Sequence, residues 1–261
     1  MNHNRFILIP IIIAIIVVFF YPLAAFAGTT EAPLIPIPNL QIGLLPADKP
    51  QDVALSLQII ALLTVLSLAP AILLMVTSFT RVIIVLGFVQ RAIGLQQTPP
   101  PQVISGLALF LTLFIMTPTW TEIYDNALAP YLAGNISSSQ AWDGTIKPVR
   151  EFMKKYTHEE ELSLMISAAK MEQPGNFDDV PTRILIPAFM LSELKTAFQM
   201  GVVIFIPFIV VDMIVSSVLL AMGMMMLPPM MISLPFKVIL FVMADGWNLV
   251  VLSVLKSFIN V

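Results

Sequence analysis

Six charged side chains stand inside otherwise apolar stretches, where an ion pair or a proton relay could be built. They are Arg81, Glu193, Lys195, Asp212, Lys237 and Asp245. An ionised side chain within a bilayer costs at least about 2.5 kcal/mol, so it normally faces an opposite charge or water. We expect Arg81, Asp212 and Asp245 to be buried among helices. Three roles stay open: a structural ion pair, a proton relay, or a side chain that reaches water from a helix end.

Glu193 and Lys237 are predicted to pair with each other. They carry opposite charges and lie on the two arms of a predicted C-terminal helical hairpin. The pair would form within one chain or between neighbouring copies, and removing one partner would strand the other charge. We also expect an ion-pair role for Asp212, and we expect Lys195 to extend toward water.

Catalytic constellations are absent from the sequence. The chain has two histidines, His3 and His158, and no cysteine, which excludes a cysteine nucleophile and a thiolate metal site. Asp178 and Asp179 precede Val-Pro, a turn pattern in which adjacent side chains diverge. GxSxG, HExxH and a glycine-rich phosphate loop do not occur. We therefore expect no enzyme activity, no cofactor and no metal site.

The stretch AMGMMMLPPMM, residues 221–231, is rich in methionine. Its candidate gate residues are Met222, Met224, Met225, Met226, Met230 and Met231. Methionine fills irregular cores, its thioether binds soft metals, and its unbranched side chain adapts to changing shapes. Gly223 and Pro228-Pro229 interrupt any continuous helix. Core packing, a soft-metal site and a deformable seal around the axis of a ring of copies therefore all stay open.

The composition predicts an all-α integral membrane protein made of helical hairpins with a small polar helical domain. Of the 261 residues, 58% are hydrophobic and only 11% are charged, about half the charged share of soluble domains. Several apolar runs approach or exceed the ~18 residues that cross a bilayer. The net charge of −3 gives no electrostatic reason to expect nucleic acid as a partner.

Residues 1–27 have the pattern of a signal peptide. Arg5 precedes the apolar run Phe6–Phe20, and Ala25-Phe26-Ala27 supplies a small-x-small cleavage pattern. The alternative is an uncleaved first membrane helix. Cleavage would place the mature N-terminus on the outer side of a bacterial inner membrane.

The rest of the chain divides into four predicted segments. They are an extended proline-rich lead-in (28–52), N-terminal hydrophobic helices (53–118), a polar helical domain (119–182) and the C-terminal hairpin with its methionine-rich tip (183–261). Proline removes a backbone donor and bends or ends helices. We therefore expect a kink at Pro70, a helix stop at Pro118, and a break or bend at Pro187 and Pro207.

The polar domain contains one clear amphipathic helix. Thr157 and Glu160 have capping-box spacing, and Leu162 and Ile166 follow at helical intervals. We expect the apolar stripe of this helix to dock within the same chain, since a stripe this short usually closes its own domain.

Three blocks of sequence carry a family resemblance. They are TSFTRVIIVLGFVQRAIGLQQTPPPQVISGLALFLTLFIM (Thr77–Met116), FMLSELKTAFQMG (Phe189–Gly201) and VDMIVSSVLLAMGMMMLPPMMISLPFKVILFVMADGW (Val211–Trp247). These blocks resemble FliP, an integral membrane component of the flagellar type III protein export gate that also occurs in virulence secretion systems.

The resemblance implies a homo-oligomeric portal for unfolded flagellar export substrates. It implies assembly with FliQ-like and FliR-like subunits in a helical cone raised out of the bilayer plane, beside FlhA-like and FlhB-like export components. The expected location is the bacterial inner membrane, in the flagellar basal body. The resemblance also implies that Met224, Met225 and Met226 form a gasket around the passing chain, and that Glu193 and Lys237 pair between subunits.

Other functions fit parts of the same pattern. A virulence-type secretion gate shares the resemblance, and a small-solute secondary transporter would also carry half-helices and charges near the membrane centre. A purely structural scaffold, with the methionines as core, is a further alternative.

Overall fold

Helices are the only regular elements in the part of the chain that the computed structural model describes, residues 50–95, 98–172, 174–224 and 227–259. In chain order they are α2 (Pro50–Met75), α3 (Phe79–Ile93), α4 (Pro101–Ile115), α5 (Thr117–Ile123), the π-helical turn η1 (Tyr124–Leu128), α6 (Ala129–Leu132), α7 (Ser138–Tyr156), α8 (Glu159–Ala168), the 3-10 turn η2 (Phe177–Asp179), α9 (Thr182–Ala221), α10 (Pro229–Met243) and α11 (Gly246–Lys256). The all-α class is thus confirmed for these residues. The predicted signal peptide, and residues 28–49 of the predicted lead-in, lie outside them.

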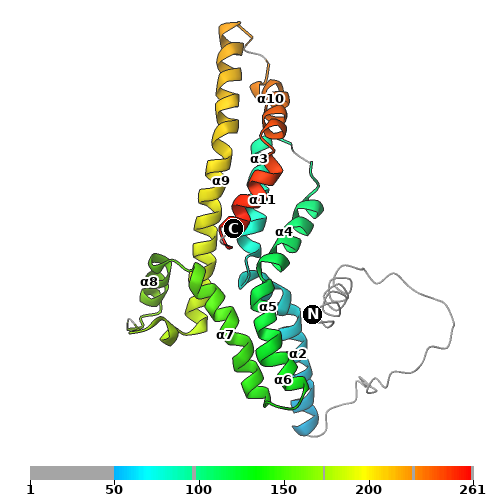
Figure 1. Cartoon of the computed structure of the whole chain (residues 1–261), viewed down its shortest axis with the longest axis vertical. Coiled ribbons are helices and arrows are strands. Elements are labelled where there is room, and N and C mark those ends of the chain that lie inside the picture. Colours follow the sequence, from blue (N-terminus) through cyan, green and yellow to red (C-terminus); the bar gives the residue numbers. More distant parts are fainter. Residues whose placement is uncertain (1–49, 96–97, 173, 225–226, 260–261) are drawn as a thin grey trace, which may run out of the picture. The chain divides into compact units, whose positions relative to one another are not determined.

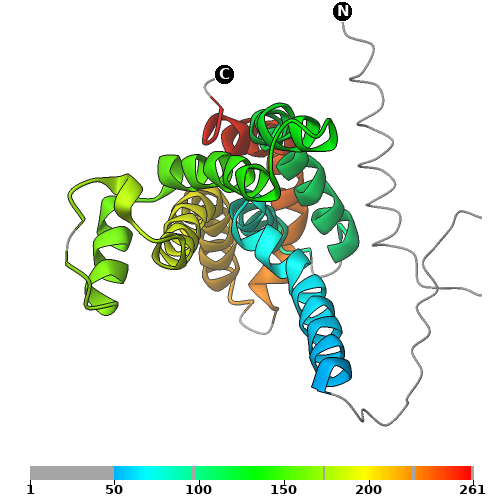
Figure 2. The ribbon, with the colours of Figure 1, turned by 90° about the horizontal axis from the view of Figure 1, so that it is seen from below.

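Helix α3 is the centre of the main core. Val82, Val85, Leu86 and Val89 are fully buried, and their spacing places them on one helix face. The helix contacts α4, α9, α10 and α11, and Figure 2 shows it between α9 and α4. Burial of such a side chain contributes about 1.5–3 kcal/mol, so this face organises the helices around it.

The chain bends between α2 and α3, whereas a kink at Pro70 within α2 stays a prediction. Helix α2 continues through Pro70, and a bend of 64° separates its part after Ile60 from α3. A proline removes only its own backbone donor. At the actual break, the Phe79 N–H donates to the Thr77 hydroxyl at 3.4 Å, which competes with the helical hydrogen-bond pattern.

The apolar helix that was predicted to stop at Pro118 does end just before it, and Pro118 itself lies in the first turn of the next helix. Helix α4 ends at Ile115, and Pro118 is the second residue of α5, where a missing N–H costs nothing because the first helical donors are unpaired anyway. The segment then continues through η1 and α6 as far as Leu132. Helices α5 and α6 and the turn η1 all pack against α7.

The polar region packs its amphipathic helix against α9. Leu162 and Ile166 are buried in a core shared with α9, which confirms docking within the chain. The predicted capping box is wrong: His158 caps α8 without a side-chain hydrogen bond, and the Thr157 hydroxyl donates to a carbonyl of the preceding helix. A capping box forms instead between Ser137 and Gln140 at the start of α7.

Helix α9 is a single helix of 40 residues that continues through Pro187 and Pro207. A break at these prolines is therefore excluded, whereas a bend there stays a prediction. At 1.5 Å per residue the helix is about 60 Å long. Among the described helices, α9 alone is long and apolar enough to cross a membrane, and three bent helix pairs meet the same test jointly. Each proline costs α9 one backbone hydrogen bond. Packing against α3, α7, α8 and α10 stabilises the helix despite this loss.

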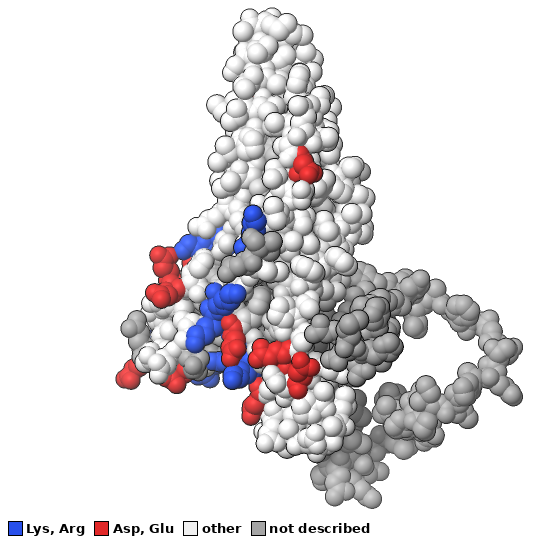
Figure 3. Space-filling model, viewed as in Figure 1, with Lys and Arg blue, Asp and Glu red and all other residues white. Residues whose placement is uncertain are grey.

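The return arm of the hairpin consists of α10 and α11, which are bent by 61° relative to each other. Asp245, with φ of 49°, stands in the left-handed region at the bend. Helix α10 contacts both α9 and α3, and α11 also contacts α3 (Figure 1). On the face seen in Figure 3, charged side chains gather over the polar region, and the upper part is almost uncharged.

Replacing Gly201 by alanine should lower the thermal stability of the purified protein. A Cβ there would lie 2.4 Å from a ring atom of Phe88, and this ring is held by edge contacts to Phe198 and Phe205. Overpacking such a contact costs about 1–3 kcal/mol.

The matched control is Gly87→Ala, whose added Cβ meets no atom within 4 Å. Exchange of a helical glycine for alanine stabilises by about 0.5–1 kcal/mol. Thermal unfolding in mild detergent, followed by circular dichroism, should shift the midpoint in opposite directions in the two variants. A Gly201→Ala variant as stable as the wild type would contradict the close contact between α3 and α9.

Candidate functional site

A buried ion pair joins α3 to α9. Arg81 donates from Nε to Oε2 of Glu193 at 2.9 Å and from Nη2 to Oε1 of the same carboxylate. The side chains are 4% and 0% exposed. Two parallel hydrogen bonds from one guanidinium to one carboxylate are the strongest geometry available to such a pair. The expected burial of Arg81 is thus confirmed, and its partner is Glu193.

A second cluster of polar side chains joins α9 to α10 near the hairpin tip. Lys237 donates to Oδ2 of Asp212 at 2.5 Å, and the Ser233 hydroxyl donates to Oδ1 at 2.5 Å. Lys237 and Ser233 are buried, and Asp212 is half-buried. Both carboxylate oxygens are therefore satisfied. The ion pair holds the two arms together, and Asp212 is less buried than expected; its ion-pair role stays a prediction.

Glu193 and Lys237 do not meet within the chain. The register of the hairpin explains why. Asp212 lies nine residues before the end of α9 at Ala221, and Lys237 lies eight residues after the start of α10 at Pro229, so the two face each other. Glu193 lies 19 residues before Asp212, about 28 Å along the helix. A pairing of Glu193 with Lys237 between neighbouring copies stays a prediction.

Lys195 has partners that the sequence did not suggest. Its Nζ lies 2.6 Å from Oε2 of Glu160 and 2.8 Å from Oε1 of Glu161, so it fastens α8 to α9 instead of merely extending toward water. The hydrogen bond from Lys195 lowers the pKa of Glu161, against a smaller effect of burial that raises it. The His158 N–H adds a backbone hydrogen bond to the Ser192 hydroxyl on α9 at 2.9 Å.

Asp245 is exposed within the chain, so the prediction that it is buried is wrong for one copy. It stands in the left-handed conformation at the start of α11 and accepts a hydrogen bond from the Asn248 side chain at 3.0 Å. The bend between α10 and α11 turns this position away from the core around α3. Aspartate tolerates the left-handed region better than most residues, which accounts for its presence there.

The described methionines of the tip do not fill the core of this chain. Met222, Met230 and Met231 are 66 to 70% exposed, and Met224 is 41% exposed, whereas Met225 and Met226 lie outside the described residues. Helix α9 ends at Ala221. Gly223, two residues later, has a left-handed φ of 75°, and the Met224 N–H donates to the Leu219 carbonyl at 3.0 Å. The tip is thus a helix end that presents thioether side chains outward.

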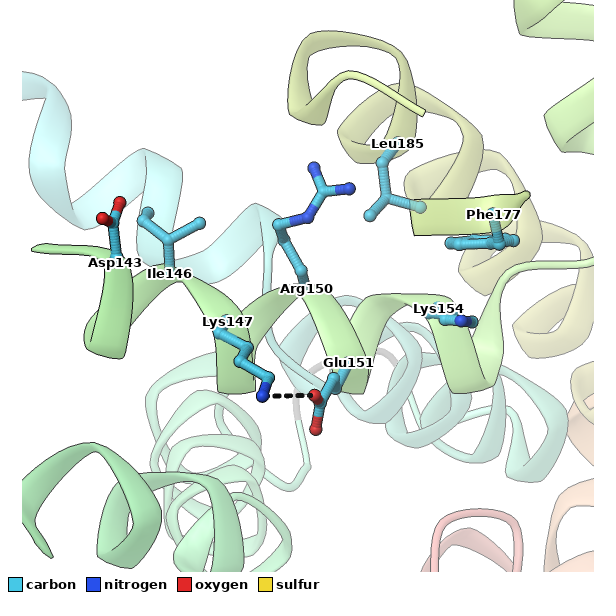
Figure 4. A pocket seen from close by; sticks show the side chains of 8 residues that line it. All are labelled: Asp143, Ile146, Lys147, Arg150, Glu151, Lys154, Phe177 and Leu185. Atoms are coloured by element: carbon cyan, nitrogen blue, oxygen red, sulfur yellow. Dashed lines mark ion pairs between the residues drawn. The ribbon is translucent and has the colours of Figure 1, made fainter. Parts of the chain in front are cut away.

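Two hollows lie outside these clusters. An apolar groove of about 490 Å³ runs between α9 and α10 next to the tip and is lined by Val211, Ile214, Val215, Val218, Leu219, Met222, Ile232 and Phe236. A second hollow of about 350 Å³ lies along α7 and is lined by Asp143, Ile146, Lys147, Arg150, Glu151, Lys154, Phe177 and Leu185 (Figure 4). It mixes both signs of charge. No three histidine, aspartate or glutamate side chains are placed to hold a metal ion in the described part of the chain.

Comparison with known proteins agrees with the family resemblance. The FliP family pattern matches residues 62–254. The flagellar biosynthetic protein FliP of Bacillus subtilis is 51% identical over 220 residues, covering 84% of this chain and 100% of the relative. The protein of that name from Borreliella burgdorferi is 52% identical over 210 residues, covering 79% and 83%. The one from Treponema denticola is 46% identical over 249 residues, covering 92% and 90%.

Replacing Glu193 by glutamine should destabilise the protein by about 3–5 kcal/mol, because it leaves the buried Arg81 charge without its counter-ion. Glu151→Gln is the matched control. Glu151 pairs with Lys147 at 4.0 Å with both side chains largely exposed, and such surface pairs contribute about 0–1 kcal/mol. Thermal unfolding in detergent measures both variants, and equal midpoints would contradict the buried pair.

The contact between α8 and α9 should weaken in acid. A carboxyl with a lowered pKa stabilises the fold fully above its ordinary pKa, and that contribution is lost as pH falls through the lowered value. Unfolding midpoints should therefore fall with pH below about 4.5, and less steeply in Lys195→Ala. Glu159→Gln, a neighbouring carboxyl on α8, is the control and should keep the wild-type slope. An unchanged slope in Lys195→Ala would contradict the assignment.

Proposed function

The chain belongs to the FliP family, and we propose that it is a flagellar biosynthetic protein: a subunit of the type III export gate that admits unfolded flagellar proteins. Several copies would form a ring, with FliQ-like and FliR-like subunits, and would act beside FlhA-like and FlhB-like export components. The bacterial inner membrane at the flagellar basal body is the proposed location. The observation that carries the proposal most directly is the exposed methionine tip on a hairpin whose arms are fastened together.

The tip has the physical properties of a seal. Its described methionines are largely exposed, so in one chain they have no core to fill. An unbranched thioether side chain changes rotamer at little cost and packs against irregular surfaces. Tips that converge on one axis would exclude water and ions when the passage is empty. They would yield to a polypeptide because no fixed geometry between them has to be broken.

The hairpin below the tip supports the proposed ring. Large apolar side chains are exposed along α9 and α10, among them Ile206, Met213, Ile214, Val218, Phe236 and Val242. Exposed apolar surface of this extent marks contact with other subunits or lipid. The apolar groove between α9 and α10 lies within this surface, and we propose that it receives a neighbouring copy. The fastening of Asp212 to Lys237 would keep the two arms together as copies assemble.

Replacing Met224, Met225 and Met226 together by alanine should raise ion leakage through the assembled complex and leave assembly intact. The shorter side chains cannot fill the axis, and Met224, the described residue of the three, is 41% exposed and lies outside the core. Leakage is measured as sodium or chloride sensitivity of cells that express the complex. Assembly is measured by size-exclusion chromatography of the purified complex.

Met243→Ala is the matched control, because Met243 is 82% exposed but lies at the opposite end of α10. It should leave leakage at the wild-type level. Unchanged leakage with lost assembly in the triple variant would favour the methionines as packing between subunits and would contradict the seal.

A further inference from the structure

The last turn of the described chain is fastened to the buried ion pair. The third guanidinium nitrogen of Arg81, Nη1, donates to the Ser257 carbonyl at 3.3 Å and to the Ser257 hydroxyl at 3.1 Å. Ser257 directly follows the end of α11 at Lys256. Carbonyl groups at a helix C-terminus lack intrahelical donors and carry partial negative charge, so a cation there is stabilising. Arg81 therefore joins α11 to α3 and α9 through one side chain.

Phe258 adds an aromatic contact to the same node. Its ring centroid lies 3.9 Å from Cζ of Arg81 and 4.9 Å from the centroid of Tyr156. The Tyr156 hydroxyl donates to the Phe258 carbonyl at 2.5 Å, and the ring of Phe152 lies nearly parallel to that of Phe258 with centroids 6.2 Å apart. Phe258 is only 5% exposed. Phe258 is thus packed between Arg81 of α3 and the C-terminal end of α7.

The chemistry of this node requires arginine. One side of the guanidinium holds Glu193, the remaining nitrogen holds Ser257, and its face lies against Phe258. A lysine could match the charge but could not present this planar fork or stack on the ring. The proposed ring seal uses none of the contacts to Ser257 and Phe258, so these contacts need an account of their own.

The return arm is consequently fastened at both ends. Near the tip, Lys237 holds α10 to α9 through Asp212, and at the far end Arg81 holds the turn after α11. Between the two fastenings lies the 61° bend at Asp245. If α10 and α11 were held at one end only, the pair could pivot about that contact. Contacts at both ends keep the two helices in position.

We propose that Arg81 is a positioning residue that clamps the C-terminal turn, Ser257 and Phe258, and so fixes the arm that presents the methionine tip. The clamp itself stands on the contacts above, and its effect on the tip rests on the proposed export function. Two separate measurements therefore test the two parts.

Hydrogen exchange of the purified protein in mild detergent tests the clamp. The double variant Ser257→Ala/Phe258→Ala removes the side-chain contacts of the C-terminal turn, namely the Ser257 hydroxyl and the Phe258 ring. It leaves the pair of Arg81 with Glu193 in place. Exchange of the amides of residues 254–259 should rise at least tenfold.

The matched control is Ser253→Ala/Leu249→Ala, one to two turns earlier in α11, where the serine hydroxyl bonds only its own helix and the leucine is exposed. This control should raise exchange of the amides of residues 254–259 less than twofold. A second control, Ser257→Thr with Phe258 intact, keeps the hydroxyl and should also raise exchange less than twofold. Equal exchange in the double variant and its control would overturn the clamp.

Swimming in soft agar, with recovery of the assembled complex, tests the effect on the tip. In a strain lacking its own copy, the wild-type chain should restore swimming, and failure to do so would contradict the proposed function itself. The double variant should assemble but reduce the swimming radius at least twofold, while the control variant swims normally. Loosened exchange with normal swimming would overturn the positioning role.

Discussion

The buried pair of Arg81 and Glu193 is the constraint on which the rest of the structure depends. It stands where α3, α9 and the end of the chain meet, and it is almost fully shielded from water. Two charges buried in this way lose several kcal/mol of solvation each, which only their mutual hydrogen bonds and attraction return. Since either charge alone would be strongly unfavourable, α3 and α9 are held in one register. The apolar face of α3 then places α4, α10 and α11 around it.

Ion pairs between helices lie in one part of the structure, and exposed apolar surface lies in another. Ion pairs hold α8 to α9 through Lys195 and hold α10 to α9 through Asp212, whereas the outward sides of α2, α9 and α10 are exposed and apolar. Polar contacts of defined geometry therefore fix the single chain, and the apolar surface that remains exposed is where the proposed assembly would meet lipid and neighbouring subunits. The described methionines of the tip belong to this exposed surface, which suits the proposed deformable seal.

Local structural features were predictable from the sequence, but the side chains that pair with each charged residue were not. The helices, the stripe of Leu162 and Ile166, and the interrupted tip follow from spacing and from glycine and proline within a few residues. The expected alternative of a helix break at Pro187 and Pro207 failed, because tertiary packing decides whether a helix tolerates a lost hydrogen bond. The partner of Glu193 is 112 residues away in sequence and follows only from helix packing. Counting residues from the tip would have matched Asp212 with Lys237.

The central claim is that methionine tips from several copies meet around one passage. The most direct test is an electron-microscopy reconstruction of the complex purified in mild detergent. The account predicts a ring in which Met224, Met225 and Met226 of every copy line the narrowest point of a central channel. A reconstruction with these side chains turned outward to detergent, far from any central opening, would contradict it.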